Sequence, residues 1–267
     1  MDQDCDGLDW SPIASAPVHS AFAGVLAGLV FAGIVLLLSV RSDQVRRTNA
    51  LVIFGSSFLV LAFDAFLFGV IAGERICARA WTETMHAAGL LGLGALGIFA
   101  GICWLIDTSD TTAGRMTRFY VITTYVIAII VTYHVGATAV EYLESVAAYS
   151  DTPTWLAGVA RAYGWLLLGC ILLIALMLAV HRSRDIVHRR IANRFVTATA
   201  YAYVACVVVA LYAAGGAAGS AEDWARVSAT QLAWNTLTAL VFPGIAVLAQ
   251  ISTLPSGRDA SEPNGQR

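Results

Sequence analysis

The feature that most constrains the fold of this chain is a set of seven apolar stretches, each about 20 residues or longer. About 20 helical residues cross the ~30 Å hydrocarbon core of a bilayer. In lipid each segment must satisfy its own backbone hydrogen bonds, so such stretches form helices. We therefore predict an all-α membrane protein, a seven-transmembrane helix bundle. The stretches cover residues 21–40, 51–72, 85–106, 119–140, 156–180, 195–215 and 227–251.

The overall composition agrees with a chain whose solvent is lipid. Of its 267 residues, 58% are hydrophobic and only 13% are charged. Soluble domains carry roughly 25% charged residues. We expect a multi-pass protein of the cell membrane, with an extracytoplasmic arm (residues 1–20), a membrane domain (21–251) and a disordered cytoplasmic tail (252–267). Residues 1–19 contain four Asp and no Lys or Arg, so we expect the first stretch to be retained rather than cleaved as a signal peptide.

The distribution of Arg predicts the orientation of the bundle. The chain has 16 Arg and no Lys, and twelve of the Arg follow the first, third, fifth and seventh stretches. The other four are Arg75, Arg79, Arg161 and Arg226. Because cytoplasmic loops are enriched in basic residues, we expect the N-terminus outside and the C-terminus in the cytoplasm.

The loop from His181 to Arg194, "HRSRDIVHRRIANR", is the most charged segment. One interpretation is an orientation determinant near anionic lipid head groups. The other is a docking surface for a cytoplasmic protein partner. The lipid bilayer is the other expected partner. Nucleic acid is not expected as a partner, and the oligomeric state stays open. The docking candidates are Arg182, Arg184, Arg189, Arg190 and Arg194.

Two cysteines, Cys5 and Cys77, fall on the predicted outer side. Disulfides persist in an oxidising exterior, so these two residues either form a bond or remain as free thiols.

Small residues recur along two of the stretches. Ser20, Gly24, Gly28 and Ala32 follow one face of the first, and the third contains five Gly between residues 89 and 101. Small stripes allow helices to approach closely in lipid, so we expect both to pack within the bundle. For the first stretch, a dimer contact is the alternative.

Asp64 interrupts the apolar run "FLVLAFDAFLFG" at residues 58–69. It lies ~20 Å from the inner end of its stretch and ~12 Å from the outer end, at 1.5 Å per residue. A charge at that depth costs at least ~2.5–3.5 kcal/mol, so Asp64 should face the bundle interior and have a partner. Arg161 is the favoured partner, in an ion pair. His134 and Asn235 are the alternatives.

Other polar and aromatic residues gather in the same outer half. Tyr133, Tyr163, Trp165 and Trp234 either line a pocket or belong to the interfacial aromatic belt. Pro243 should free a backbone carbonyl near Ala239 and shape the last helix. The candidates for a ligand or proton site are Asp64, Glu83, His86, His134, Arg161, Trp165, Gln231, Trp234 and Asn235.

Several chemistries are disfavoured. A retinal Schiff base needs a Lys, and the chain has none. Intramembrane zinc hydrolases use His near the last span, which has none here, and only His86 and His134 offer a haem pair. We expect no cofactor and no metal. The favoured function is a sensor or accessory protein with an outward-facing pocket and a basic cytoplasmic face. The alternatives are a small transporter or proton-coupled channel using Asp64, His134 and Arg161, and, least supported, an intramembrane enzyme or redox protein.

Overall fold

The computed structural model describes residues 11–39, 44–106, 111–149, 156–181, 186–219 and 229–255. Within these ranges all regular elements are helices, and seven helical segments are long and apolar enough to cross a membrane. The chain is therefore compatible with a multi-pass membrane protein. The elements are α1 (Pro12–Ser39), α2 (Gln44–Ile71), α3 (Cys77–Ile106), α4 (Thr111–Tyr149), α5 (Leu156–His181), α6 (Ile186–Gly219), α7 (Ala229–Thr236), the π-helix η2 (Leu237–Val241) and α8 (Phe242–Ser252).

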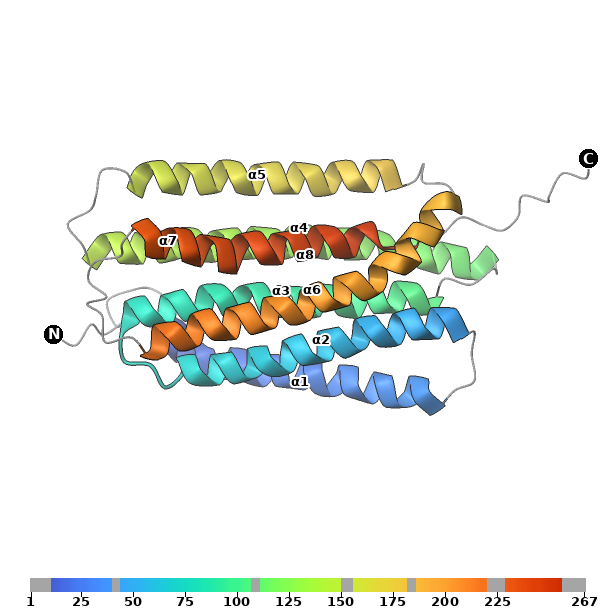
Figure 1. The fold of residues 1–267 in the computed structure, drawn as a ribbon, viewed down its shortest axis with the longest axis horizontal. Helices are drawn as coiled ribbons and strands as arrows, with labels where there is room; N and C mark the ends of the chain where they lie inside the picture. Colours follow the sequence, from blue (N-terminus) through green and yellow to red (C-terminus); the bar gives the residue numbers. More distant parts are fainter. Residues whose placement is uncertain are drawn as a thin grey trace, which may run out of the picture.

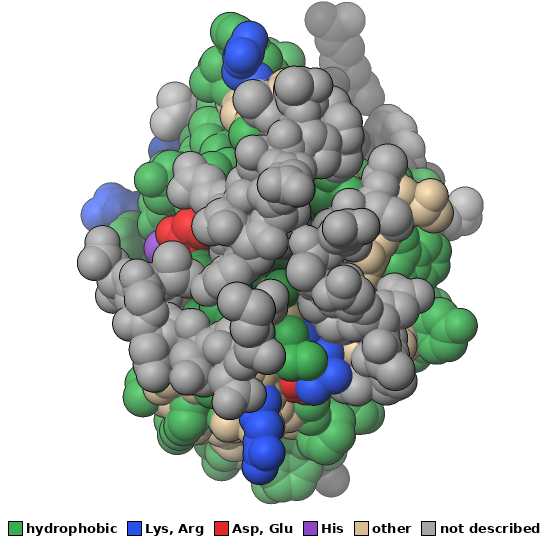
Figure 2. Space-filling view, turned by 90° about the vertical axis from the view of Figure 1, so that its left-hand side faces the viewer, with side chains coloured by type: hydrophobic (Ala, Val, Ile, Leu, Met, Phe, Trp, Pro, Cys, Tyr) green, Lys and Arg blue, Asp and Glu red, His purple; other side chains and the backbone are tan. Residues whose placement is uncertain are grey.

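The helices run alternately up and down, so α1, α3, α5 and α7 all begin at one end of the bundle (Figure 1). We call this the α1 end. Figure 2 looks onto it, and where described side chains are visible in this view the charged ones lie in separate places next to hydrophobic ones. Helix α1 begins at Pro12, before the apolar stretch itself starts at residue 21.

Helix α3 is the centre of the bundle. It packs against α2, α4, α6 and α8, whereas α1 packs mainly on α2, and α5 packs mainly on α4 at the opposite edge (Figure 1). The glycines of α3 allow this crowding. A Cβ atom at Gly94 would lie 2.5 Å from the Leu61 side chain, and one at Gly101 would lie 2.7 Å from the Phe54 ring. The predicted close packing of the third stretch is confirmed.

The small residues of the first stretch behave differently. Gly24, Gly28 and Ala32 are exposed, and a Cβ at either glycine would meet nothing within 4 Å. The expectation that this stripe packs inside the bundle is wrong, because α1 turns Ala23 and Ala27 inward instead. At its start the stripe does make one contact, in which the Ser20 hydroxyl donates to the Ala65 carbonyl of α2 at 2.8 Å.

The flanks of the bundle are apolar. Large side chains stand exposed along the helices, among them Phe22, Leu29, Phe119, Leu172 and Tyr212. A surface of this kind is unfavourable in water and is stabilised when hydrocarbon covers it.

Candidate functional site

The last apolar segment is broken in its middle, next to α3. Pro243 has no N–H to donate to the Ala239 carbonyl, which removes one helical hydrogen bond. The helix widens here into η2, where the Phe242 N–H bonds the Leu237 carbonyl five residues back. The Ala239 oxygen faces α3 and would lie 3.3 Å from a Cβ at Gly89, so glycine eases this close approach. The break lies where Pro243 predicted it, and π-helical turns of this kind are frequent at functional sites.

A buried hydrogen-bond network surrounds this break. His86 Nδ1 lies 2.8 Å from the Thr82 carbonyl, and His86 Nε2 lies 2.8 Å from the Thr238 hydroxyl. Since a carbonyl oxygen only accepts, Nδ1 carries a hydrogen. The imidazole is thus held between α3 and η2, and His86 is only 1% exposed.

Two tyrosines extend the network to α4 and α5. The Asn235 amide donates to the Tyr142 hydroxyl at 3.1 Å, and the Tyr163 hydroxyl is hydrogen-bonded to Thr236. We call Thr82, His86, Tyr142, Tyr163, Asn235, Thr236 and Thr238 the interior polar cluster. Its members connect four membrane-length segments through hydrogen bonds to one another. The cluster therefore stabilises the packing of these segments.

Two carboxyl groups are buried outside this cluster. Asp64 on α2 and Glu83 on α3 are both 0% exposed, and none of their oxygens has a hydrogen-bond partner among the described residues. Asp64 therefore faces the interior, but the partner expected for it there is missing.

The predicted ion pair between Asp64 and Arg161 is wrong. Arg161 is exposed on α5, which lies across the bundle from α2 (Figure 1). His134 is exposed on α4, and Asn235 bonds Tyr142 instead. The prediction failed because residues at a similar depth can lie on opposite sides of a bundle.

The remaining candidates divide between flank and interior. Trp165 is 70% exposed, Trp234 is 45% exposed and Tyr133 is 57% exposed, so these three rings point away from the interior. Their placement agrees with an aromatic belt rather than with a pocket. Gln231 is half-buried, and Tyr163 belongs to the interior polar cluster.

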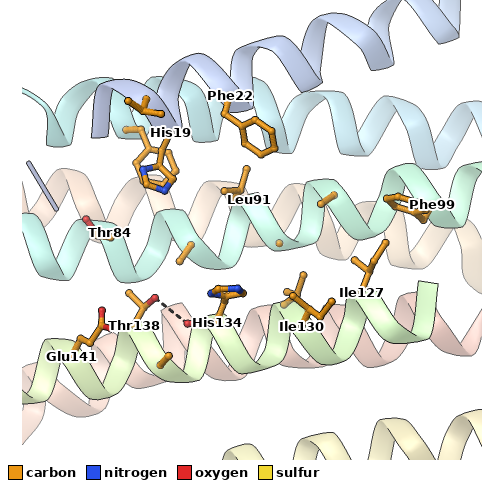
Figure 3. Close-up of a pocket in the computed structure, with 17 residues that line it drawn as sticks. His19, Phe22, Thr84, Leu91, Phe99, Ile127, Ile130, His134, Thr138 and Glu141 are labelled. Atoms are coloured by element: carbon orange, nitrogen blue, oxygen red, sulfur yellow. Dashed lines mark hydrogen bonds between the residues drawn. The ribbon is translucent and has the colours of Figure 1, made fainter. Parts of the chain in front are cut away.

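A groove of 840 Å³ runs along α3 between α1 and α4 (Figure 3). We call it the lateral groove. Small residues of α3, Ala88, Gly92 and Ala95, form its floor. It opens on the flank of the bundle, because its lining residues Phe22 and Ile130 are 53% and 49% exposed.

The two ends of the lateral groove differ in polarity (Figure 3). The end near the start of α1 holds His19, Thr84, His134, Thr138 and Glu141. The rest is apolar, lined by residues that include Phe22, Leu91, Phe99, Ile127 and Ile130. Such a division fits a molecule with a polar head and an apolar body.

Sequence reasoning found only His134 among these groove residues. His19, Thr84 and Glu141 were missed because they lie on three different helices. The one available signal was the small residues of the third stretch, which also serve close packing and so do not by themselves indicate a groove.

A second, smaller cavity of 70 Å³ lies beside the helix break. Gly89, Gly136, Tyr163 and Pro243 are among its lining residues. This cavity lies between part of α5 and α8, and it leaves open space next to η2.

Other predicted residues fall at the edge of what the structure describes. Cys77 is disulfide-bonded, whereas Cys103, Cys170 and Cys206 form no disulfide. Cys5, the expected partner, lies outside the described residues, so its pairing with Cys77 stays a prediction. Arg182 and Arg184 also lie outside them. Arg189, Arg190 and Arg194 fall in α6, but their side chains are outside the described part.

In the comparisons with known proteins, no protein-family model, curated protein or solved structure matches the chain.

Proposed function

We propose that this chain is a multi-pass membrane protein that works as a sensor or accessory protein and binds an amphiphilic small molecule in the lateral groove. One observation carries the proposal: the groove is polar at one end, apolar along the rest, and open on the flank. Its volume of 840 Å³ falls within the ~300–1,000 Å³ typical of small-molecule sites.

The distribution of Arg supports an orientation with the α1 end outside and the basic loops inside. The polar end of the groove then lies at the outer interface, where the head of an amphiphile is hydrated. The apolar part lies at the depth of the acyl chains, so a ligand would enter sideways from the outer leaflet. The basic segment at 181–194 would face a cytoplasmic partner.

Photolabelling in nanodiscs tests this function. The probe is a hexadecyl chain with a diazirine in the chain and a hydroxyl head. We expect labelled peptides from α1, α3 and α4 that face the groove, and we expect excess hexadecanol to compete.

A filling variant and a matched control complete the test. Ala95→Phe puts a ring on the groove floor and should abolish this labelling. Ala175→Phe makes the same change on the exposed face of α5, away from the groove, and should leave labelling intact. Labelling spread evenly over the flank, unchanged by Ala95→Phe, would remove the groove as a binding site.

A second candidate function is a proton-coupled transporter, and the buried carboxyl groups of Asp64 and Glu83 favour it. Ionisable residues inside a membrane often mark proton pathways. Proton uptake into liposomes reconstituted with the protein tests this candidate. Loss of uptake in Asp64→Asn would support it, and uptake equal to that of empty liposomes would exclude it.

A further inference from the structure

We propose that the lateral groove selects an amphiphile whose head donates hydrogen bonds, a long-chain alcohol or amine, over one with an anionic head. This inference rests on the proposed function, because it names the ligand class of the same groove. It follows from the hydrogen-bonding capacity of the side chains at the polar end.

His19 presents an acceptor to the groove. Its Nδ1 lies 2.9 Å from the Ser15 carbonyl, which only accepts, so Nδ1 carries a hydrogen. In the neutral imidazole the other nitrogen, Nε2, then has a free lone pair. The ring is held by stacking on Phe68, with 5.1 Å between the ring centroids. Nε2 therefore suits a ligand O–H or N–H.

Thr84 adds a hydroxyl with nothing to bond. It lines the groove from α3 and is only 4% exposed, yet its Oγ1 has no hydrogen-bond partner among the described residues. Threonines in helices commonly donate to the carbonyl four residues back, as Thr82 and Thr138 do here. A ligand head placed between α1 and α3 would satisfy this hydroxyl.

The charge at this end disfavours anions. Glu141 lines the groove on α4 and can only accept hydrogen bonds when ionised. None of the described residues that line the groove is Arg or Lys, so these residues offer a phosphate or carboxylate head no permanent cation. A hydroxyl is tolerated beside Glu141, and an ammonium is attracted to it.

The groove as a whole is long enough for a lipid-like molecule. Thr84 and Phe99 are 15 residues apart on α3, which corresponds to about 22 Å along the helix. Half the hydrocarbon core of a bilayer is about 15 Å thick. A single long chain can therefore lie against Leu91, Phe99 and Ile127 with its head at the polar end (Figure 3).

The test compares three hexadecyl photoprobes that differ only in the head: alcohol, amine and carboxylic acid. All three are applied to the full-length protein in nanodiscs of a neutral phospholipid. We expect the alcohol and the amine to label groove peptides at concentrations at least ten-fold lower than the acid.

Substitutions then assign the selectivity to residues. Thr84→Val keeps the shape and removes the hydroxyl, and should weaken alcohol labelling about five-fold, the effect of one hydrogen bond. Glu141→Gln should weaken amine labelling and strengthen acid labelling. Thr123→Val is the control, because the Thr123 hydroxyl already donates to the Phe119 carbonyl at 2.9 Å and lies outside the groove.

The outcomes separate this inference from the proposed function. If all three probes label the groove equally and Thr84→Val and Glu141→Gln change nothing, the head-group selectivity is wrong while the groove remains a binding site. If no probe labels the groove, the proposed function itself is wrong. Preference for the acid would overturn the inference directly.

Discussion

Replacing Asp64 with leucine should stabilise the folded protein, although Asp64 is a charged residue type at the centre of the bundle. Leucine has the same number of side-chain heavy atoms and the same branching, with methyl groups in place of the two oxygens. In the structure these oxygens are fully buried and have no partner among the described residues. Their removal breaks no hydrogen bond to the described residues.

The expected gain follows from the burial of polar atoms. Burying a polar group without a hydrogen bond costs about 1–3 kcal/mol by mutational measures. Asp64→Leu removes that cost, so the free energy of unfolding should rise by about 1–3 kcal/mol. Asp64→Asn keeps a polar group in the same place and should change the free energy of unfolding by less than about 1 kcal/mol.

Unfolding by SDS in bicelles, followed by circular dichroism, measures these differences. Asn235→Leu is the matched contrast, since Asn235 is also buried but donates to Tyr142. That change removes one hydrogen bond of the Tyr142 hydroxyl, which also bonds Thr82, and should destabilise the fold by about 0.5–1.5 kcal/mol. Replacement by leucine should therefore raise the free energy of unfolding at position 64 and lower it at position 235.

The reasoning is refuted if Asp64→Leu destabilises the protein by several kcal/mol. Breaking a buried ion pair costs about 3–5 kcal/mol. In that case Arg161→Gln should offset part of the loss, and the coupling energy in the double-mutant cycle should exceed about 0.5 kcal/mol. The exposed position of Arg161 on α5 predicts additive effects instead.

Three further predictions concern packing, covalent structure and orientation. Gly101→Ala should destabilise the fold by about 1–3 kcal/mol in SDS unfolding, because its Cβ would overlap the Phe54 ring. Gly28→Ala has open space around it and should be neutral or slightly stabilising. Equal effects of the two substitutions would contradict the packing described. Mass mapping without reductant should recover a Cys5–Cys77 peptide, and alkylation of both thiols under those conditions would exclude the bond. A C-terminal reporter that is active only in the periplasm should be silent and a cytoplasmic one active; the reverse would place the groove's polar end inside.

The number of membrane-length apolar segments and the burial of Asp64 were determined by the sequence alone, whereas several helices, such as α4, extend well beyond the predicted stretch. Both follow from local free energies. Apolar length decides whether a segment can cross hydrocarbon, and each segment must satisfy its own backbone hydrogen bonds. An Asp in the middle of such a segment is driven to the interior by the same cost of exposure to lipid.

Position around the bundle axis was decided only by the tertiary structure. Distance along a helix predicts the depth of Asp64 and Arg161, but not that α2 and α5 lie apart. The small residues of α1 and α3 look alike in sequence, yet only those of α3 are enclosed, because α3 is the helix that the others surround. The lateral groove arises for the same reason: α1 and α4 both pack on α3 and leave Ala88 and Ala95 half-buried along the space between them. Which helices become neighbours depends on the packing of all seven segments together, and no single segment contains that information.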